Sequence, residues 1–232
     1  MSQLTIALAK GRLLEPSIKL FESLGYDLRD ARDSRKLILE SGRARFLIAK
    51  ASDVPIYVEY GAADIGIVGQ DALRESGANV YEPLVLGYGV CRLVVAGKPE
   101  YKDNSASRGE SKLATGSSVP RDAALQSEWK MLAGLRVATK YPRSAQKYFA
   151  ARGLSVEIIA LYGSIELAPM VGLADLIVDV VDTGRTLREN GLVELDEIFK
   201  SQAAFIVNRA AHTLKVDAIR SLMEYIEKTS NS

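Results

Sequence analysis

Short apolar runs alternate with segments of helical spacing along most of this 232-residue chain. The runs have the length of strands, and in several intervening segments the apolar residues recur every three or four positions, as on one face of a helix. Strands are predicted at 3–9, 46–49, 64–68, 80–86, 91–96, 135–138, 156–161 and 176–181, and helices at 54–60, 70–75, 143–151 and 165–171. This alternation indicates an α/β layered fold with a largely parallel sheet.

Two further helices are marked by apolar residues that share one face. The first follows the strand at 3–9 and ends near Gly25, a typical C-cap residue; its candidate buried positions are Leu13, Ile18, Leu20, Phe21 and Leu24. Apolar runs at 192–195 and 205–207 precede the second, which closes the chain. Its predicted buried face consists of Leu214, Ile219, Leu222, Met223 and Ile226.

Residues 98–122 interrupt this pattern, because they are rich in Ser, Gly, Lys and Asn and show no sustained apolar period. We expect them to form a mobile surface insertion. Around it the chain divides into two lobes: residues 1–90 with the returning segment 184–232, and residues 91–183, which include the insertion. Two α/β lobes predict a cleft, and ligands of such sheets bind beyond the carboxyl ends of the strands.

Composition and charge exclude several classes of protein. Hydrophobic residues make up 47% of the chain and charged residues 25%, which is the balance of a globular protein. Lys and Arg number 30 against 29 Asp and Glu, so no overall positive charge favours nucleic acid. The single Cys91 and single His212 exclude an internal disulfide and a multi-histidine zinc site. Without a signal peptide or a long apolar run, a cytoplasmic protein that spans no membrane is expected.

The loop after the strand at 176–181 carries the strongest chemical signal. It consists of Asp179 and Asp182 at the carboxyl end of the strand, followed by Thr183, Gly184, Arg185 and Thr186 at the start of a helical segment. Gly184 permits a positive φ, Thr186 can cap the helix, and the backbone N–H groups can hold a phosphate while the carboxylates accept sugar hydroxyls. The loop resembles the phosphoribosyl-pyrophosphate loop of phosphoribosyltransferases. A buried strand followed by a capped helix is the structural alternative.

Glu166 stands at the start of the predicted helix at 165–171. Pro169 falls in the first turn of that helix, where its missing N–H costs little. We expect the Glu166 carboxylate to converge with Asp179 on one cleft, although it can also serve only the helix dipole.

Residues 163–191, GSIELAPMVGLADLIVDVVDTGRTLRENG, closely resemble the signature region of the ATP phosphoribosyltransferase family. The other matching motifs occur in family order: AKGR (9–12), SRKL (34–37), ASDVP (51–55), GAADIGIVG (61–69), GVCRL (89–93) and ATKY (138–141). The resemblance covers nearly the whole chain apart from the insertion. The two predicted lobes in turn resemble the type II periplasmic-binding-protein architecture.

The resemblance implies transfer of the phosphoribosyl group of phosphoribosyl pyrophosphate to N1 of ATP, with release of pyrophosphate, in the first step of histidine biosynthesis. The family uses Mg²⁺, and we single out no metal-ligating side chain. Adenine N1 is the nucleophile, so no Ser/His or Cys/His pair is needed. The anionic phosphates require fixed cations, for which Lys10, Arg12 and Arg35 are candidates.

The resemblance also assigns site residues. The implied catalytic residues are Arg12, Arg35, Glu166 and Asp179. The implied phosphoribosyl pyrophosphate site is Asp179, Asp182, Thr183, Gly184, Arg185 and Thr186, and the implied ATP site is Lys10, Gly11, Arg12, Asp53, Gly69 and Tyr141. Simpler roles remain open: solvated charges for Lys10, Arg12 and Arg35, a helix cap for Asp53, a tight turn at Gly69 and packing for Tyr141. Lys50 departs from the arginine that the family often carries and lacks its bidentate fork.

The length resembles that of the short form of the family, which lacks the C-terminal domain that binds histidine. This form implies a regulatory subunit resembling histidyl-tRNA synthetase in a hetero-octamer, and a homodimer when the chain is alone. The rival interpretation is a non-catalytic cytoplasmic nucleotide or solute-binding sensor, which would bind without releasing pyrophosphate. A degraded, purely structural family member is a third interpretation, against which the complete 183–186 loop argues.

Overall fold

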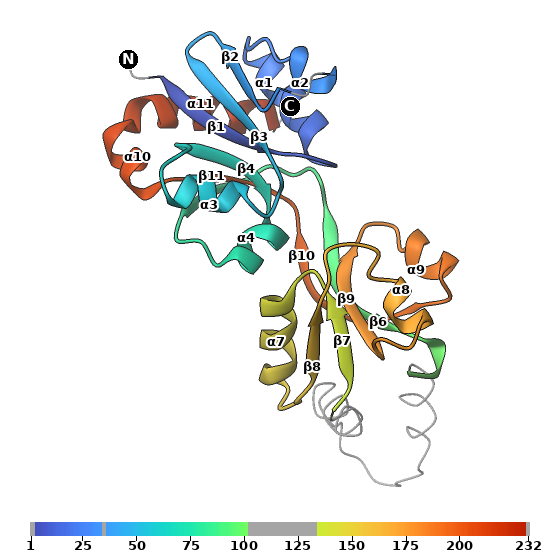
Figure 1. Ribbon diagram of the computed structural model, residues 1–232. Helices are drawn as coiled ribbons and strands as arrows, with labels where there is room; N and C mark the ends of the chain where they lie inside the picture. Colours follow the sequence, from blue (N-terminus) through green and yellow to red (C-terminus); the bar gives the residue numbers. More distant parts are fainter. Residues whose placement is uncertain (1–2, 34–35, 102–133, 231–232) are drawn as a thin grey trace, which may run out of the picture. The chain divides into compact units, whose positions relative to one another are not determined.

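The computed structural model describes residues 3–33, 36–101 and 134–230 (Figure 1). Two compact units divide the chain: unit 1 is Met1–Val90 with Ser201–Ser232, and unit 2 is Cys91–Lys200. Arg35 and residues 102–122 of the predicted insertion lie outside the described residues.

Unit 1 is built on a six-stranded sheet with the order β2-β3-β1-β4-β11-β5. The strands are β1 (Leu4–Ala9), β2 (Ile38–Ser41), β3 (Ala44–Ala49), β4 (Ile65–Gly69), β5 (Tyr81–Val85) and β11 (Ala203–Val207). The neighbours β3, β1 and β4 run parallel, whereas β2, β11 and β5 pair antiparallel. The carboxyl ends of three adjacent strands therefore meet at one edge of this sheet.

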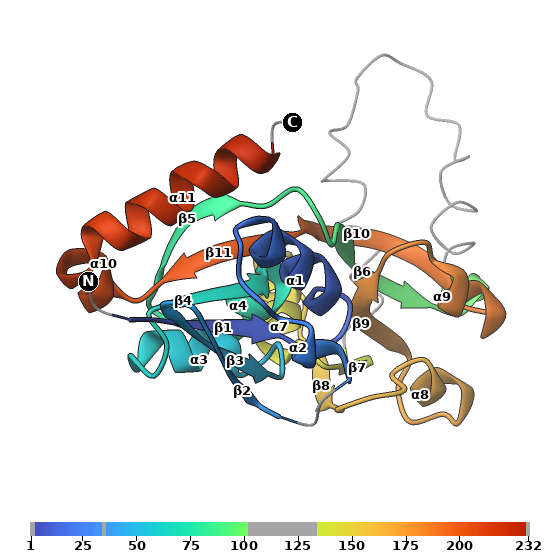
Figure 2. The ribbon, with the colours of Figure 1, turned by 90° about the horizontal axis from the view of Figure 1, so that it is seen from above.

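Helices cover both faces of the unit 1 sheet (Figure 2). They are α1 (Leu14–Ser23), α2 (Asp30–Asp33), α3 (Val54–Glu59), α4 (Gln70–Ser76), α10 (Arg209–Leu214) and α11 (Val216–Ser230). On the side of α1 and α11, the Tyr225 hydroxyl donates to the Ser23 carbonyl at 3.4 Å. Phe21, Tyr26 and Phe46 meet edge to face with centroids 5.1 to 5.9 Å apart, and burying each such ring stabilises the fold by about 1.5–3 kcal/mol.

Unit 2 is built on a five-stranded sheet with the order β10-β6-β9-β7-β8. The strands are β6 (Cys91–Gly97), β7 (Arg136–Thr139), β8 (Glu157–Ala160), β9 (Leu176–Val181) and β10 (Val193–Ser201). β7 runs parallel to both β8 and β9, and β6 runs antiparallel to β9. Three adjacent strands again end at one edge.

Both faces of the unit 2 sheet are buried, by α7 (Pro142–Ala151) on one side and by α8 (Leu167–Met170) and α9 (Arg185–Glu189) on the other (Figure 1). Successive residues of a strand point to opposite faces. Val178 accordingly packs with Phe149 of α7, whereas Ile177 packs with Ile165 and Leu187. This double burial explains why β9 is apolar at every position except Asp179.

The expectation of a largely parallel sheet is wrong, because antiparallel strands enter both sheets. Strand β2 was not predicted, since its alternating exposed and buried residues form no apolar run. Strand β10 extends far beyond the predicted run at 192–195. Its full length was missed because its charged residues break the apolar pattern. These charges are paired with arginines elsewhere in the chain: Glu194 with Arg92, and Asp196 with Arg152.

The chain returns to unit 1 later than we expected. Strand β10 pairs with β6, so residues 184–200 belong to unit 2 and only Ser201–Ser232 return. The closing helix is interrupted at Lys215, whose ammonium is bound by Asp64 at 2.7 Å. Ile219, Leu222 and Ile226 are buried as predicted, but Leu214 is 81% exposed, because it ends α10 before the buried face of α11 begins.

Candidate functional site

The predicted residues of unit 1 follow the carboxyl ends of its adjacent parallel strands. Lys10, Gly11 and Arg12 follow β1, Asp53 follows β3, and Gly69 ends β4. Ligands of open α/β sheets bind at this kind of edge. The topology therefore gathers residues that are up to 59 positions apart in the sequence, as Lys10 and Gly69 are.

The same holds in unit 2. Tyr141 follows β7, Glu166 follows β8, and Asp182 opens the loop after β9. Ile165 shares a buried cluster with Val181 and Leu187, so the start of α8 and the loop after β9 lie on the same side of the sheet.

Arg12 is the best-positioned cation of unit 1. Its Nη1 donates to the Gly89 carbonyl at 3.0 Å, and its Nη2 lies 3.5 Å from Oδ1 of Asp71. Gly11 turns the chain just before it with φ +87°. Because the side chain stays 42% exposed, the guanidinium is oriented by the protein and still accessible to an anion.

Asp71 is a buried carboxylate that the sequence analysis missed. Ser201 donates its hydroxyl to Oδ1 of Asp71 at 2.7 Å and accepts the Asp71 N–H at 2.9 Å. A Cβ on Gly69 would lie 2.2 Å from the same Oδ1, so only glycine lets the carboxylate take this position. Asp71 and Ser201 are 130 residues apart, and no local pattern could have linked them.

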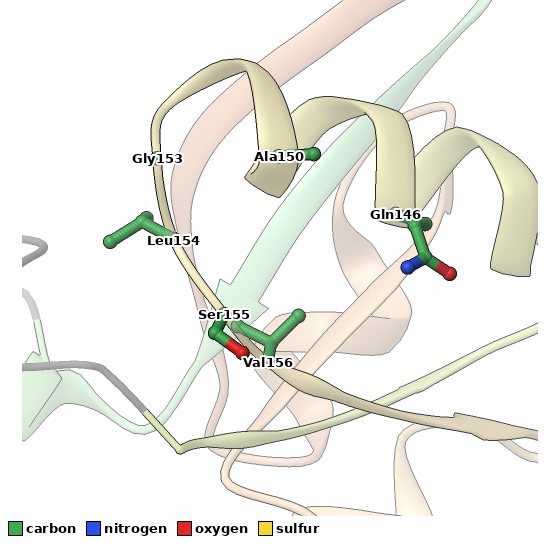
Figure 3. A pocket seen from close by; sticks show the side chains of 6 residues that line it. All are labelled: Gln146, Ala150, Gly153, Leu154, Ser155 and Val156. Atoms are coloured by element: carbon green, nitrogen blue, oxygen red, sulfur yellow. The ribbon is translucent and has the colours of Figure 1, made fainter.

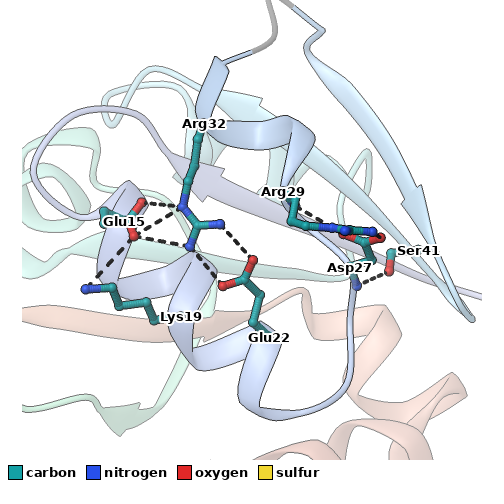
Figure 4. A network of polar contacts seen from close by, with 7 residues as sticks. All are labelled: Glu15, Lys19, Glu22, Asp27, Arg29, Arg32 and Ser41. Carbon is teal, nitrogen blue, oxygen red and sulfur yellow. Dashed lines mark hydrogen bonds and ion pairs between the residues drawn. The ribbon is translucent and has the colours of Figure 1, made fainter.

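Arg35 lies outside the described residues, but its charged neighbours form ion pairs. Arg32 donates to both Glu15 and Glu22 of α1, with shortest distances of 3.0 and 2.8 Å (Figure 4). This hydrogen bonding lowers the pKa of Glu22. Lys36 lies 3.4 Å from Asp30. The network in Figure 4 thus ties α2 to α1 on an exposed surface.

Asp53 and Tyr141 both precede helices. Asp53 occupies the N-cap position of α3 without a side-chain capping bond, so the capping role predicted for it is wrong; it instead accepts from the Ser52 hydroxyl at 2.7 Å. Tyr141 precedes α7, donates its N–H to Oγ1 of Thr139 at 2.8 Å, and packs partly buried against the apolar cluster of α7. Packing therefore accounts for at least part of the role of Tyr141.

The loop after β9 contains a tight turn. Gly184 is buried with φ +72°, which confirms the positive φ expected there, while Asp182 and Thr183 are exposed. Because α9 begins at Arg185, Gly184 holds the N-cap position and Thr186 lies inside the helix, so the predicted capping by Thr186 is wrong. The N–H groups of the first turn of a helix have no acceptor within it.

Two side chains that follow the 183–186 loop bind its carbonyl groups. Nη1 of Arg188 donates to the Thr183 carbonyl at 3.0 Å, and the Asn190 amide donates to the Thr186 carbonyl at 2.8 Å. Arg185 instead donates to Glu189 at 2.7 Å. Asp179 lies inside β9, opposite Val94 of β6, and not in the loop after the strand as predicted; it is half-buried, and its Oδ1 accepts the N–H of Val180 at 2.8 Å. Arg188 was missed, because the sequence shows that it follows the loop but not that its side chain turns back to the Thr183 carbonyl.

Two cavities lie away from these residues. One, of about 310 Å³, is formed by Gln146 and Ala150 of α7 and by residues 153–156 (Figure 3). It lies at the end of α7 and before β8, whereas Tyr141 and Glu166 lie at the opposite edge of the sheet. The other, of about 350 Å³, is lined by Asp27, Arg29, Asp30, Leu39 and Glu40.

Among the described residues, no three His, Cys, Asp or Glu side chains are grouped so that they could hold a metal ion. No helix in this part of the chain is long and apolar enough to cross a bilayer.

Solved structures place the chain in a fold class. The periplasmic aliphatic sulphonate binding protein SsuA from Escherichia coli aligns with a TM-score of 0.56 at 15% identity, covering 99% of this chain and 69% of that one. The substrate binding protein of an amino acid ABC transporter aligns with a TM-score of 0.57 at 14% identity, covering 99% and 92%. These likenesses concern the fold alone, and they confirm the type II periplasmic-binding-protein-like class.

Closer relatives define the family. The ATP phosphoribosyltransferase (HisG) family model matches residues 50–228. The chain is 48% identical to an ATP phosphoribosyltransferase of Acidithiobacillus ferrooxidans, covering 97% of this chain and 96% of the relative, and 45% identical to ATP phosphoribosyltransferase 2 of Geobacter sulfurreducens, covering 97% of both. A chain of the HisG:HisZ complex from Thermotoga maritima aligns with a TM-score of 0.77 at 32% identity, covering 99% of both.

The chain therefore belongs to the ATP phosphoribosyltransferase family. Its members are pentosyltransferases, which move the phosphoribosyl group of phosphoribosyl pyrophosphate to ATP in the first step of histidine biosynthesis. The rival interpretation, a non-catalytic sensor, is not favoured.

Proposed function

We propose that residues 179 and 182–186 bind phosphoribosyl pyrophosphate, and that Lys10, Gly11, Arg12, Asp53, Gly69 and Tyr141 bind ATP. One observation carries the proposal: Lys10, Asp53 and Gly69 stand at the carboxyl ends of three adjacent parallel strands, and residues 182–186 follow the carboxyl end of β9, which runs parallel to β7. The buried turn at Gly184 and the exposed Thr183 beside it suit close approach of a phosphate to the backbone.

The transfer breaks the bond between C1′ of the ribose and a pyrophosphate oxygen, which keeps the electron pair, and forms a bond from adenine N1 to C1′. Asp182 accepts hydrogen bonds from the ribose hydroxyls. Asp179 and Glu166 stabilise the positive charge that develops on the ribose ring. Arg12 and Arg35 stabilise the negative charge on the phosphates. No side chain is required as a nucleophile.

Mg²⁺ suits this site. Mg²⁺ is usually held by one or two carboxylates together with substrate phosphates. Asp182 opens the loop proposed to bind phosphate, and Asp179 precedes it within β9, so these carboxylates would hold the ion. When bound, the ion would neutralise charge on the departing pyrophosphate.

A regulatory partner is part of the proposal. The Thermotoga maritima neighbour was solved as a HisG:HisZ complex, and this chain covers 99% of the chain it matches. We therefore propose a subunit resembling histidyl-tRNA synthetase in a hetero-octamer, a homodimer in its absence, and a cytoplasmic location. Native mass spectrometry of the chain with and without a co-expressed candidate subunit tests both assemblies.

Product formation tests the activity. The purified chain is incubated with ATP, phosphoribosyl pyrophosphate and Mg²⁺, each omitted in turn, with and without the regulatory subunit. Phosphoribosyl-ATP and pyrophosphate that require both substrates support the proposal. A folded chain that binds both substrates and yields no product in either arm would instead be a sensor.

A further inference from the structure

The Thr183–Gly184 turn is flanked by charged side chains that the family resemblance does not assign to the site. A Cβ on Gly184 would lie 3.1 Å from Nη1 of Arg188 and 3.1 Å from Oε1 of Glu194. Two side chains of opposite charge therefore lie directly against the backbone of the turn.

Arg188 binds two successive carbonyl groups of the turn. Its Nη1 donates to the Thr183 carbonyl at 3.0 Å, and its backbone N–H donates to the Gly184 carbonyl at 3.2 Å. In a trans peptide the N–H points opposite to the C=O. The N–H groups of Gly184 and Arg185 therefore point away from these contacts, so Arg188 determines which polar groups of the turn face a ligand.

Arg92 binds Glu194, the second charged side chain beside the turn. Its Nη1 and Nη2 donate to the two carboxylate oxygens of Glu194 at 2.7 and 3.0 Å, and its Nη1 also lies 3.5 Å from Glu197. Arg92 is on β6 opposite Val181, the last residue of the strand that leads into the loop. A carboxylate beside a phosphate site would repel the ligand, and the bidentate pair offsets that charge.

We propose that Arg188 and the Arg92–Glu194 pair are positioning residues, which keep the N–H groups of Gly184 and Arg185 directed at the phosphates of phosphoribosyl pyrophosphate. The inference rests on the proposed function, because it assumes that this loop binds that substrate. It adds three residues to the site, none of which the family resemblance assigns to it.

Glu194→Ala separates positioning from simple electrostatics. If the charge near the loop alone mattered, removing a carboxylate would leave Arg92 uncompensated, and the KM for phosphoribosyl pyrophosphate would fall. If Glu194 positions the turn, that KM rises, by about tenfold for a lost contact of charged groups, while the KM for ATP stays within about twofold. Arg188→Met removes the bond to the Thr183 carbonyl and is expected to raise the same KM.

Steady-state kinetics of the full chain test the inference, with Arg136→Gln as the matched control. Arg136 also lies near a carboxylate of unit 2, Asp175 at 3.6 Å, but at the amino end of β7. Thermal unfolding verifies that each variant is folded. If Glu194→Ala does not fold, the kinetics of Arg188→Met alone test the inference. An unchanged or lower KM for phosphoribosyl pyrophosphate, or equal rises for both substrates, overturns the inference. A wild-type chain without product would instead contradict the proposed function.

Discussion

The guanidinium of Arg12 lies beside the buried carboxylate of Asp71, with Nη2 of the arginine 3.5 Å from Oδ1 of the aspartate. Asp71 is itself fixed by the hydroxyl of Ser201. A second donor of Arg12, Nη1, binds the Gly89 carbonyl. Asp71 of α4 and Gly89, just before β6, thus orient the exposed guanidinium of Arg12 after β1. Stabilisation of a leaving group requires such preorganised charge.

Asp71→Asn is predicted to act through Arg12. Arg12→Ala should lower kcat by about a hundredfold, because it removes charge stabilisation from the phosphates. Asp71→Asn should lower kcat by about tenfold in the wild-type background and have little effect in the Arg12→Ala background. Steady-state kinetics of this double-mutant cycle check the coupling, with the exposed Asp217→Asn as control. Independent, additive losses would show that Asp71 does not position Arg12.

Asp179→Asn is predicted to impair catalysis while preserving the local fold. Asparagine keeps an oxygen that can accept the Val180 N–H, which lies 2.8 Å from the carboxylate, but it loses the negative charge. We expect kcat/KM for phosphoribosyl pyrophosphate to fall by about a hundredfold, with the KM for ATP unchanged. Glu157→Gln, on the exposed start of β8, serves as control. Wild-type kinetics in Asp179→Asn would mean that the reacting ribose lies elsewhere.

Gly66→Ala is predicted to destabilise unit 1. A Cβ there would lie 2.8 Å from Val58, 2.9 Å from Val54 and 3.0 Å from Ile206, so the methyl group would overpack the contact between α3 and β4. The expected cost is about 1–3 kcal/mol of the free energy of unfolding, measured by urea denaturation. Gly163→Ala, which has open space around its Cβ, should change stability much less. Equal effects of the two substitutions would contradict the close packing at Gly66.

Tyr88 is predicted to make stability sensitive to high pH. Burial raises the pKa of Tyr88 to about 12, although its hydrogen bond with Ser17 opposes the rise. The unfolded state therefore loses this proton first, and the stabilisation is complete below about pH 10 and is lost as the pH rises toward 12. Tyr88→Phe should remove a slope of about 1.4 kcal/mol per pH unit in that window. Denaturation of both proteins at several pH values checks this, and parallel curves would contradict it.

Local patterns could predict most strands and helices, because burial on one or both faces leaves a period in the sequence. They failed where polar residues are satisfied by distant partners. Strand β10 carries Glu194 and Asp196, whose charges are paired with Arg92 and Arg152. No residue near β10 in the sequence reveals these pairs.

In the candidate site, too, local motifs could be predicted and contacts between distant residues could not. The loop at 182–186 could be found because turn chemistry and phosphate binding require a short run of particular residues. The residues that hold the site in place could not. Asp71 is held by Ser201, 130 residues away, and Glu194 beside Gly184 is held by Arg92, 102 residues away, so no local pattern reveals either contact.

The central claim, that the turn at Gly184 binds phosphoribosyl pyrophosphate, is tested most directly by the dissociation constant of that substrate for Gly184→Ala, measured by calorimetry. Gly153→Ala is the matched control, because Gly153 has nearly the same φ, +71° against +72°, but open space around its Cβ. The account predicts that Gly184→Ala weakens binding by at least about tenfold and Gly153→Ala by less than about twofold. Equal affinities in the two folded variants would contradict it.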